Sequence, residues 1–545
     1  MIENTVVPWG AAATTDKKQI LKSASLITAI TIASRTLGYV RDQRITLLLG
    51  ASLASDSYYL AYSIPNLLRR LVGEGSMTAS FIPVFTAYQS DKPDEEVWDF
   101  ANRLFWTLAI LLACITVLGM LFSPQVIHMF TFFGHAPQKW DQAVELNRIM
   151  FPYIFFIGLA ALSMAILNCH HVFGLPASTP ILLNLAIIAC STAGVWRYFG
   201  NPARSIAVGV VIGGALQMLV QIPALVRHGM RFKFGISLKH PGVRAVGRLM
   251  IPGFFGIGIY QVNFVIDRLF ATAAKMPEGT LTSLYVADRI MELVLGGYAI
   301  AVATAILPMM SRQAATRDYD ALKKTFSFSL RIVSYITIPA TVGMMILRVP
   351  IIRVLFEHGK FVASSTELTA RALFYYAIGL PAFAAIKLLV PAFYSTQDTR
   401  TPVKVAFYAL VVNIVLNAIF LKSFFQTFKN GGPAFATAIA AYFNFAILFV
   451  VFRQRFGRLG TFSILYSMAK IGIASAVMGV ACYAMVHYSK FESYTHFLPQ
   501  LILFTAMIVG ATVLYIAITW LLRCPEVEEV WGVAKRSSPP GVSAG

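Results

Sequence analysis

Hydrophobic segments about 20 residues long recur along the whole chain, and they constrain its fold more than any other feature. The 545-residue chain is 57% hydrophobic and only 13% charged, with a mean hydropathy of +0.67. Soluble domains are typically about 25% charged, and about 20 consecutive apolar residues suffice to cross a bilayer as a helix. The sequence therefore predicts an all-α, polytopic membrane protein with about 14 transmembrane helices.

The apolar windows place these helices along the chain. We expect them near residues 23–49, 55–88, 99–122, 145–168, 176–198, 204–227, 244–274, 279–312, 320–347, 366–396, 401–423, 430–453, 463–487 and 496–522. Several ranges exceed the length needed to cross the hydrocarbon core, so we expect tilt or kinks. The second range contains Pro65, Gly73, Gly75 and Pro83 and is expected to be bent or broken.

Basic loops orient the predicted helices. The segment between the sixth and seventh helices, RHGMRFKFGISLKHPGVRAVGR, is strongly basic, whereas the first hairpin loop, GASLASDS, has no Lys or Arg. Because basic loops stay on the cytoplasmic side, we expect residues 1–22 and 523–545 to be cytoplasmic tails. The net charge of +20 then reflects contacts with anionic lipid headgroups, and nucleic acid is not an expected partner.

The chain also shows a weak internal repeat. SRTLGYVRD in the first helix corresponds to QVNFVIDRL in the seventh, and IPNLLRRLVGEG in the second to VADRIMELVLGG in the eighth. We therefore expect a first lobe at 23–227, a basic cytoplasmic linker at 228–243, and a second lobe at 244–453. Two pseudo-symmetric six-helix lobes around a central cavity form a common transporter architecture, and the two C-terminal helices within 454–522 lie outside the repeat.

Charged residues inside the predicted spans are the strongest functional signal. The first two helices carry Arg35, Arg41, Asp42, Arg44, Asp56, Arg69, Arg70 and Glu74. A charge at the bilayer centre costs at least about 2.5–3.5 kcal/mol, so such side chains normally face protein or water. Arginine exceeds acid here, and its planar fork suits phosphate, so the pattern predicts a cationic cavity and an anionic cargo.

A second charged set occupies the eighth helix. Asp288 and Glu292 are four residues apart, with Arg289 between them, so all three lie near one face. An alternative interpretation is that Arg70–Glu74 and Arg289–Glu292 are intrahelical pairs that only neutralise each other. A further alternative places Arg41 and Asp42 at the membrane surface.

Asp267 and Asp398 are candidates for a cation site, because carboxylates with nearby hydroxyl and carbonyl oxygens suit Na⁺ or H⁺ coupling. In the alternative interpretation Asp267 pairs with Arg268 and Asp398 caps the helix that begins near Thr401. No P-loop or catalytic constellation is present. We therefore expect a transporter without a bound cofactor, driven by an ion gradient or the membrane potential, and not an enzyme.

The quoted motifs, together with FEHGKF and AFYSTQDTRTPVK, resemble the MurJ/MviN lipid II flippases of the MOP exporter superfamily. The resemblance covers about residues 23–522. It implies that lipid II moves from the inner to the outer leaflet of the bacterial inner membrane by alternating access, for cell-wall synthesis, with a lipid-tail groove in the C-terminal helix pair. It also implies functional roles for the following residues: Arg35, Arg41, Asp56, Arg69, Arg70, Glu74, Asp288, Arg289 and Glu292.

The chain departs from some relatives at Ser63, where they carry lysine, and sodium coupling stays open because Asp267–Arg268 varies among them. Besides lipid II and membrane lipids, other cell-wall synthesis proteins are candidate partners. Two other functions stay open. One is export of a different polyprenyl-pyrophosphate-linked glycan by an MOP-type exporter, and the other is a membrane-embedded polyprenyl-phosphate transferase.

Overall fold

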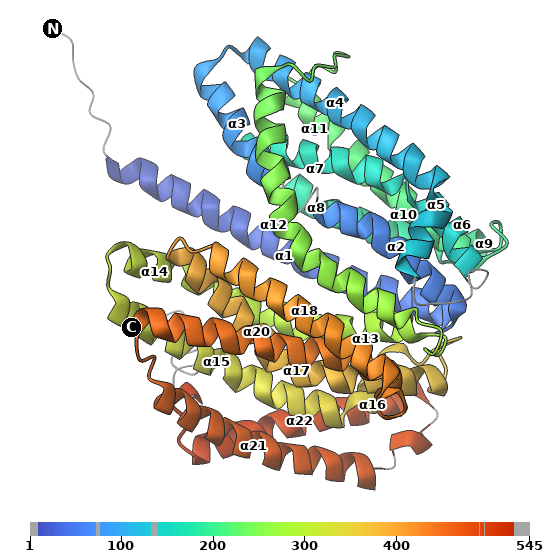
Figure 1. Cartoon of the computed structure of the whole chain (residues 1–545), viewed down its shortest axis with the longest axis vertical. Helices are drawn as coiled ribbons and strands as arrows, with labels where there is room; N and C mark the ends of the chain where they lie inside the picture. Colours follow the sequence, from blue (N-terminus) through green and yellow to red (C-terminus); the bar gives the residue numbers. More distant parts are fainter. Residues whose placement is uncertain (1–8, 72–76, 132–139, 490, 495, 528–545) are drawn as a thin grey trace, which may run out of the picture. The chain divides into compact units, whose positions relative to one another are not determined.

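The computed structural model describes residues 9–71, 77–131, 140–489, 491–494 and 496–527. Throughout these residues the regular structure is helical, with no strand (Figure 1). The all-α prediction is therefore confirmed for the described part of the chain. The described residues form two compact units, with residues up to Gln261 in the first and those from Val262 in the second, apart from the short segment 50–52, which belongs to the second.

The first unit contains eleven helices and the beginning of a twelfth. They are α1 (Trp9–Leu49), α2 (Leu53–Leu71), α3 (Met77–Asp91), α4 (Asp94–Leu121), α5 (Ser123–Phe130), α6 (Asp141–Met150), α7 (Tyr153–Cys169), α8 (Gly174–Cys190), α9 (Ala193–Trp196), α10 (Pro202–Leu219), α11 (Ile222–Arg227) and the first part of α12 (Pro241–Ala271).

The second unit continues α12 and adds the remaining elements. They are α13 (Thr280–Val294), the π-helix η3 (Leu295–Ala299), α14 (Ile300–Ala315), α15 (Tyr319–Ile346), α16 (Arg348–Phe356), α17 (Ala363–Ser395), α18 (Arg400–Lys422), α19 (Phe425–Phe428), η4 (Lys429–Gly431), α20 (Gly432–Phe456), α21 (Thr461–Tyr488), η5 (Phe491–Ser493) and α22 (Phe497–Leu521).

Ten helices of the described part, some continued through short neighbours, are long and apolar enough to cross a membrane, and α8 is a shorter apolar helix. With α1, the α2–α3 pair and α12, which carry charged residues, they are consistent with the fourteen predicted spans. The predicted second span is two helices, because α2 ends at Leu71 and α3 begins at Met77. The predicted eighth span continues from α13 through the π-helix into α14.

The ends of the chain differ from the predicted tails. Helix α1 begins at Trp9, not near residue 23, and the Ala-rich start of this helix favours the α conformation. Beyond α22, the carboxylate of Glu526 is fully buried, bonded to Arg331 of α15 (3.2 Å) and to Ser467 of α21 (2.6 Å). Residues up to Val527 therefore pack against the second unit and attach the C-terminal helix pair to α15.

Small residues let the helices of each unit approach closely. In the first unit, α10 presents Gly209 and Gly213 to α8, where an added Cβ would lie 3.1 Å from the Ile187 Cα and 2.8 Å from the Leu183 Cα, respectively. In the second, Gly379 of α17 lies against Ala438 of α20 in the same way. Gly209 and Gly213 are four residues apart on α10, the spacing of small residues that is typical of close helix packing in membranes.

This contact generates a stability prediction. Replacing Gly213 by alanine should lower the thermal midpoint of the purified protein, because overpacking costs about 1–3 kcal/mol. Gly472→Ala in α21 is the matched control, since nothing lies within 4 Å of its added Cβ. There alanine should leave or raise the midpoint, because it favours the helix by about 0.5–1 kcal/mol. Equal shifts for both variants would contradict the packing role.

Candidate functional site

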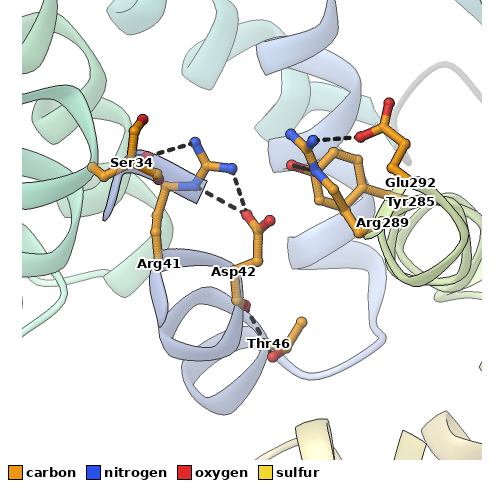
Figure 2. A network of polar contacts seen from close by, with 8 residues as sticks. Ser34, Arg41, Asp42, Thr46, Tyr285, Arg289 and Glu292 are labelled. Carbon is orange, nitrogen blue, oxygen red and sulfur yellow. Dashed lines mark hydrogen bonds and ion pairs between the residues drawn. The ribbon is translucent and has the colours of Figure 1, made fainter. Parts of the chain in front are cut away.

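Arg41 of α1 is the centre of a buried polar network in the first unit (Figure 2). Its Nε and Nη2 donate to Oδ1 of Asp42 at 3.0 and 2.7 Å, and its Nη1 donates to Oδ1 of Asn184 at 3.1 Å. Asn184, on α8, donates in turn to the backbone carbonyl of Ser34 at 3.0 Å. Arg41 and Asp42 are only 6% and 4% exposed, so this pair is buried.

Arg44, three residues further along α1, bonds to the end of α8. Its Nη2 donates to the backbone carbonyl of Ser191 at 3.2 Å. A cation at a helix C-terminus is favoured by the helix dipole. Asp42 and Arg44 therefore both fix α1 against neighbouring groups of the first unit, Asp42 through Arg41 and Arg44 through α8.

The charged residues of helix α2 lie at its two opposite ends. Asp56 is buried in the first turn, whereas Arg69 and Arg70 are half-buried in the last. Thirteen residues at about 1.5 Å each place Asp56 about 20 Å from Arg69, so they form two sites and not one. Nε of Arg69 donates to Oδ1 of Asn66 at 3.0 Å.

Two further predicted site residues are Arg35 and Glu74. Arg35 of α1 is exposed. Glu74 lies outside the described residues, so its predicted pairing with Arg70 stays a prediction.

In the second unit, Arg289 projects from α13 with three contacts on its own helix (Figure 2). Its Nη1 donates to Oε2 of Glu292 at 2.8 Å and its Nε to the Tyr285 hydroxyl at 3.1 Å, while its guanidinium lies 5.1 Å from the Tyr285 ring centroid. The intrahelical pairing is therefore confirmed. Both partners are more than a third exposed, so their attraction stabilises the unit by at most about 1 kcal/mol and is readily exchanged for another partner. Asp288, beside them, is half-buried.

A second polar cluster of this unit surrounds Asp267 of α12. Thr437 of α20 donates to its Oδ2 at 2.9 Å, and Asn417 of α18 donates to its Oδ1 at 3.4 Å. Asn413, one turn earlier on α18, bonds to both Asn417 and Thr437. One carboxylate with amide and hydroxyl oxygens provides hard oxygen ligands, the type that suits a small hard cation.

Asp398 does not belong to this cluster, and its predicted pairing with Asp267 is wrong. It accepts bonds from the backbone N and hydroxyl of Thr401 at 3.0 and 2.7 Å, and from Arg455 at 2.8 Å. Burial raises the pKa of Asp398, but the Thr401 bonds and Arg455 outweigh it and hold the pKa below its usual value. Asp398 thus caps α18 about 28 Å from Asn417 along the same helix. Within the described residues no three His, Cys, Asp or Glu side chains group as metal ligands.

Several residues that complete these sites were missed from the sequence. Asn184, Asn413, Asn417, Thr437 and Tyr285 all lie in apolar or mixed helices. Two local signals could have found some of them. Asn413 and Asn417 are one turn apart in an otherwise apolar helix, and Tyr285 precedes Arg289 by one turn.

The fold and these clusters define the class of protein. Charged groups held in non-covalent contacts on apolar helices suit the binding and movement of a charged solute, so the chain is a multi-pass membrane transporter. A family model described as lipid II flippase MurJ matches residues 45–504. The chain belongs to the MurJ family of lipid II flippases.

Individual relatives agree. A Vibrio cholerae protein named probable lipid II flippase MurJ is 37% identical over 475 residues, which are 85% of this chain and 89% of the relative. A solved structure titled lipid II flippase MurJ, inward closed conformation, is 26% identical with a TM-score of 0.75, covering 91% of this chain and 98% of that one. An inward-facing MATE multidrug transporter of the MOP superfamily, at 15% identity and TM-score 0.63, covers 80% and 99% and shares the fold.

The buried network generates a prediction. Replacing Asn184 by leucine removes the acceptor for Arg41 and the donor to Ser34 while nearly keeping the side-chain volume. A buried charged donor left without its acceptor costs about 1–3 kcal/mol, so the thermal midpoint should fall. Leu185→Ala, at an exposed position of the same helix, is the control and should change the midpoint little. An unchanged midpoint for Asn184→Leu would show that the bond to Arg41 does not hold α1 to α8.

Proposed function

We propose that this chain moves lipid II from the inner to the outer leaflet of the bacterial cytoplasmic membrane, for peptidoglycan synthesis. Membership of the MurJ family and the 37% identity to the Vibrio cholerae relative support the substrate. The observation that carries the proposal is the placement of Arg41 and Arg289 on apolar helices, each in contact with a carboxylate. Arginine stays protonated and binds pyrophosphate with parallel hydrogen bonds.

The two arginines serve different purposes in this mechanism. Arg41 is buried and bonded on three nitrogens, so it fixes local structure. Arg289 is part-exposed and contacts Glu292 and Tyr285 of its own helix. It can leave Glu292 for a phosphate oxygen at little cost, because the pair contributes at most about 1 kcal/mol. The carboxylate of Glu292 takes it back when the lipid leaves.

The distribution of charge supports an orientation in the membrane, and the substrate suggests further partners. The basic segments near residues 228–248, 312–324 and 453–458 favour an arrangement with both termini in the cytoplasm. Lipid II is a cell-wall precursor, so proteins that make or polymerise it are the proposed protein partners.

The cation cluster supplies the proposed coupling. Asp267, Asn413, Asn417 and Thr437 present a carboxylate, amide oxygens and a hydroxyl from three helices of one unit, and we assign Na⁺ to them. An ion gradient would then reset the transporter after each lipid is released. A proton or the membrane potential alone is the alternative driving force.

The arginine assignment predicts a specific loss of transport. Arg289→Ala should abolish complementation of a strain depleted of its flippase and leave lipid II on the cytoplasmic face in a leaflet-accessibility assay. Arg289→Lys should retain part of the activity, because it keeps the charge but loses the planar fork. Lys324→Ala, an exposed basic residue of α15, is the control. Normal lipid II movement with Arg289→Ala in the membrane would refute the role of this arginine.

The assignment of Na⁺ as the coupling ion is tested by applying Na⁺ and proton gradients separately. In proteoliposomes, Asp267→Asn and Thr437→Val should remove the dependence of lipid II movement on a Na⁺ gradient. The remaining rate should equal that of wild-type protein without Na⁺, because the variants remove a ligand and not a lipid contact. Asp398→Asn, in the cap of α18, should keep its Na⁺ response. If wild-type transport follows a proton gradient and ignores Na⁺, the assignment of Na⁺ is wrong.

A further inference from the structure

The basic segment between α11 and α12 lies along α4 in the first unit. Residues 228–240, here called the linker segment, contain no helix or strand. Their course is fixed at successive turns of α4. Gly229 lies against the indole of Trp98, the backbone N of Lys233 donates to Oδ1 of Asn102 at 3.1 Å, and that of Ser237 lies 3.4 Å from the Thr107 hydroxyl.

Helix α4 supplies a depth scale for the linker segment. Its charged residues are Asp94, Glu95, Glu96, Asp99 and Arg103, and from Leu104 to Leu121 none follows. The polar-to-apolar boundary of this helix therefore falls just after Arg103. Phe234 contacts Trp106 at 5.1 Å between ring centroids, and tryptophan is enriched at membrane interfaces.

The linker segment crosses this boundary and comes back. Met230 is fully buried at the charged end, Phe232 packs on Phe105 at 5.3 Å between centroids, and the segment reaches Thr107 at Ser237. It then returns, because the His240 ring stacks on Phe100 at 5.7 Å. The linker segment is thus a short loop whose tip lies at the level where the apolar part of α4 begins.

The side chains that point outward from this loop have two chemistries. Phe234, Ile236 and Leu238 are 70%, 48% and 71% exposed, which is unfavourable for large apolar groups in water. Arg231, Lys233 and Lys239 are also exposed, and residues 227–240 contain no Asp or Glu. Apolar side chains at the tip, flanked by cations at the polar level, match an acyl-chain layer below anionic headgroups.

We propose that the linker segment is a membrane-inserted loop that binds anionic phospholipid. Phe234, Ile236 and Leu238 enter the acyl region, while Arg231, Lys233 and Lys239 bind headgroup phosphates of lipids such as phosphatidylglycerol. This binding surface belongs to the first unit alone and is separate from the lipid II contacts proposed above. Lipid binding holds the linker segment between α11 and α12 at a fixed depth in the bilayer, independently of the transported lipid.

The headgroup contacts are tested by native mass spectrometry of the full chain released from membranes of phosphatidylglycerol and phosphatidylcholine. Arg231→Gln/Lys233→Gln/Lys239→Gln should retain at least about fivefold less phosphatidylglycerol than wild type, relative to phosphatidylcholine, since the loss of even one contribution of about 1 kcal/mol at an anionic surface changes binding by about that factor. Arg317→Gln/Lys324→Gln/Arg458→Gln removes the same charge from exposed positions in other basic regions and should retain clearly more phosphatidylglycerol than the linker variant. Equal loss in both triple variants would overturn the site, because net charge alone would then explain retention.

Insertion is tested by hydrogen exchange in lipid nanodiscs. The peptide covering residues 231–239 should exchange about tenfold more slowly in phosphatidylglycerol discs than in detergent, and Phe234→Asp/Leu238→Asp should restore fast exchange. Unchanged thermal midpoints show that the substituted, exposed residues are not needed for folding. Fast exchange of this peptide in discs of wild-type protein would overturn insertion, as would protection that survives the double aspartate variant. Neither readout depends on lipid II transport. The proposal of a membrane-inserted loop and the proposal of lipid II transport can therefore be refuted independently.

Discussion

A charge inside an apolar helix is stable only when another group of the protein contacts it, and the rest of this structure depends on how that requirement is met. In the first unit the Arg41 guanidinium contacts Asp42 and Asn184, which ties α1 to α8. In the second, Asp267 receives bonds from α18 and α20. The charges are therefore cross-links as well as candidate ligands. Removing one partner leaves a buried polar group with fewer hydrogen bonds, which costs more than the pair contributes.

The exposed fraction of each charged group then separates structural from exchangeable contacts. Arg41 and Asp42 are enclosed, so breaking their contact uncovers charge in a poorly solvated region. Arg289 and Glu292 keep more than a third of their side-chain surface accessible, and solvent lowers the cost of parting them. A transporter needs both kinds. The first keeps the helices of a unit in register, and the second can pass from a protein carboxylate to a phosphate and back within one cycle.

The sequence predicted what depends on local spacing and missed what depends on distant neighbours. Helical period was enough to pair Arg289 with Glu292, because the two residues lie within one turn. Asn184 could not be found this way, since its partner Ser34 is 150 residues away. Asp398 was grouped with Asp267 by residue type alone. The cap formed with Thr401, three residues on, was the better local interpretation.

The π-helix between α13 and α14 has a geometric consequence for the Arg289 face. A π turn inserts one extra residue into an α-helical path, and one residue corresponds to a rotation of about 100° around the axis. Leu295–Ala299 begins three residues after Glu292. The five residues of this turn therefore rotate the faces of α14 relative to those of α13 within one span. They let α13 aim Arg289 and Glu292 in one direction while α14 turns a different face of the same span toward its neighbours α15 and α17.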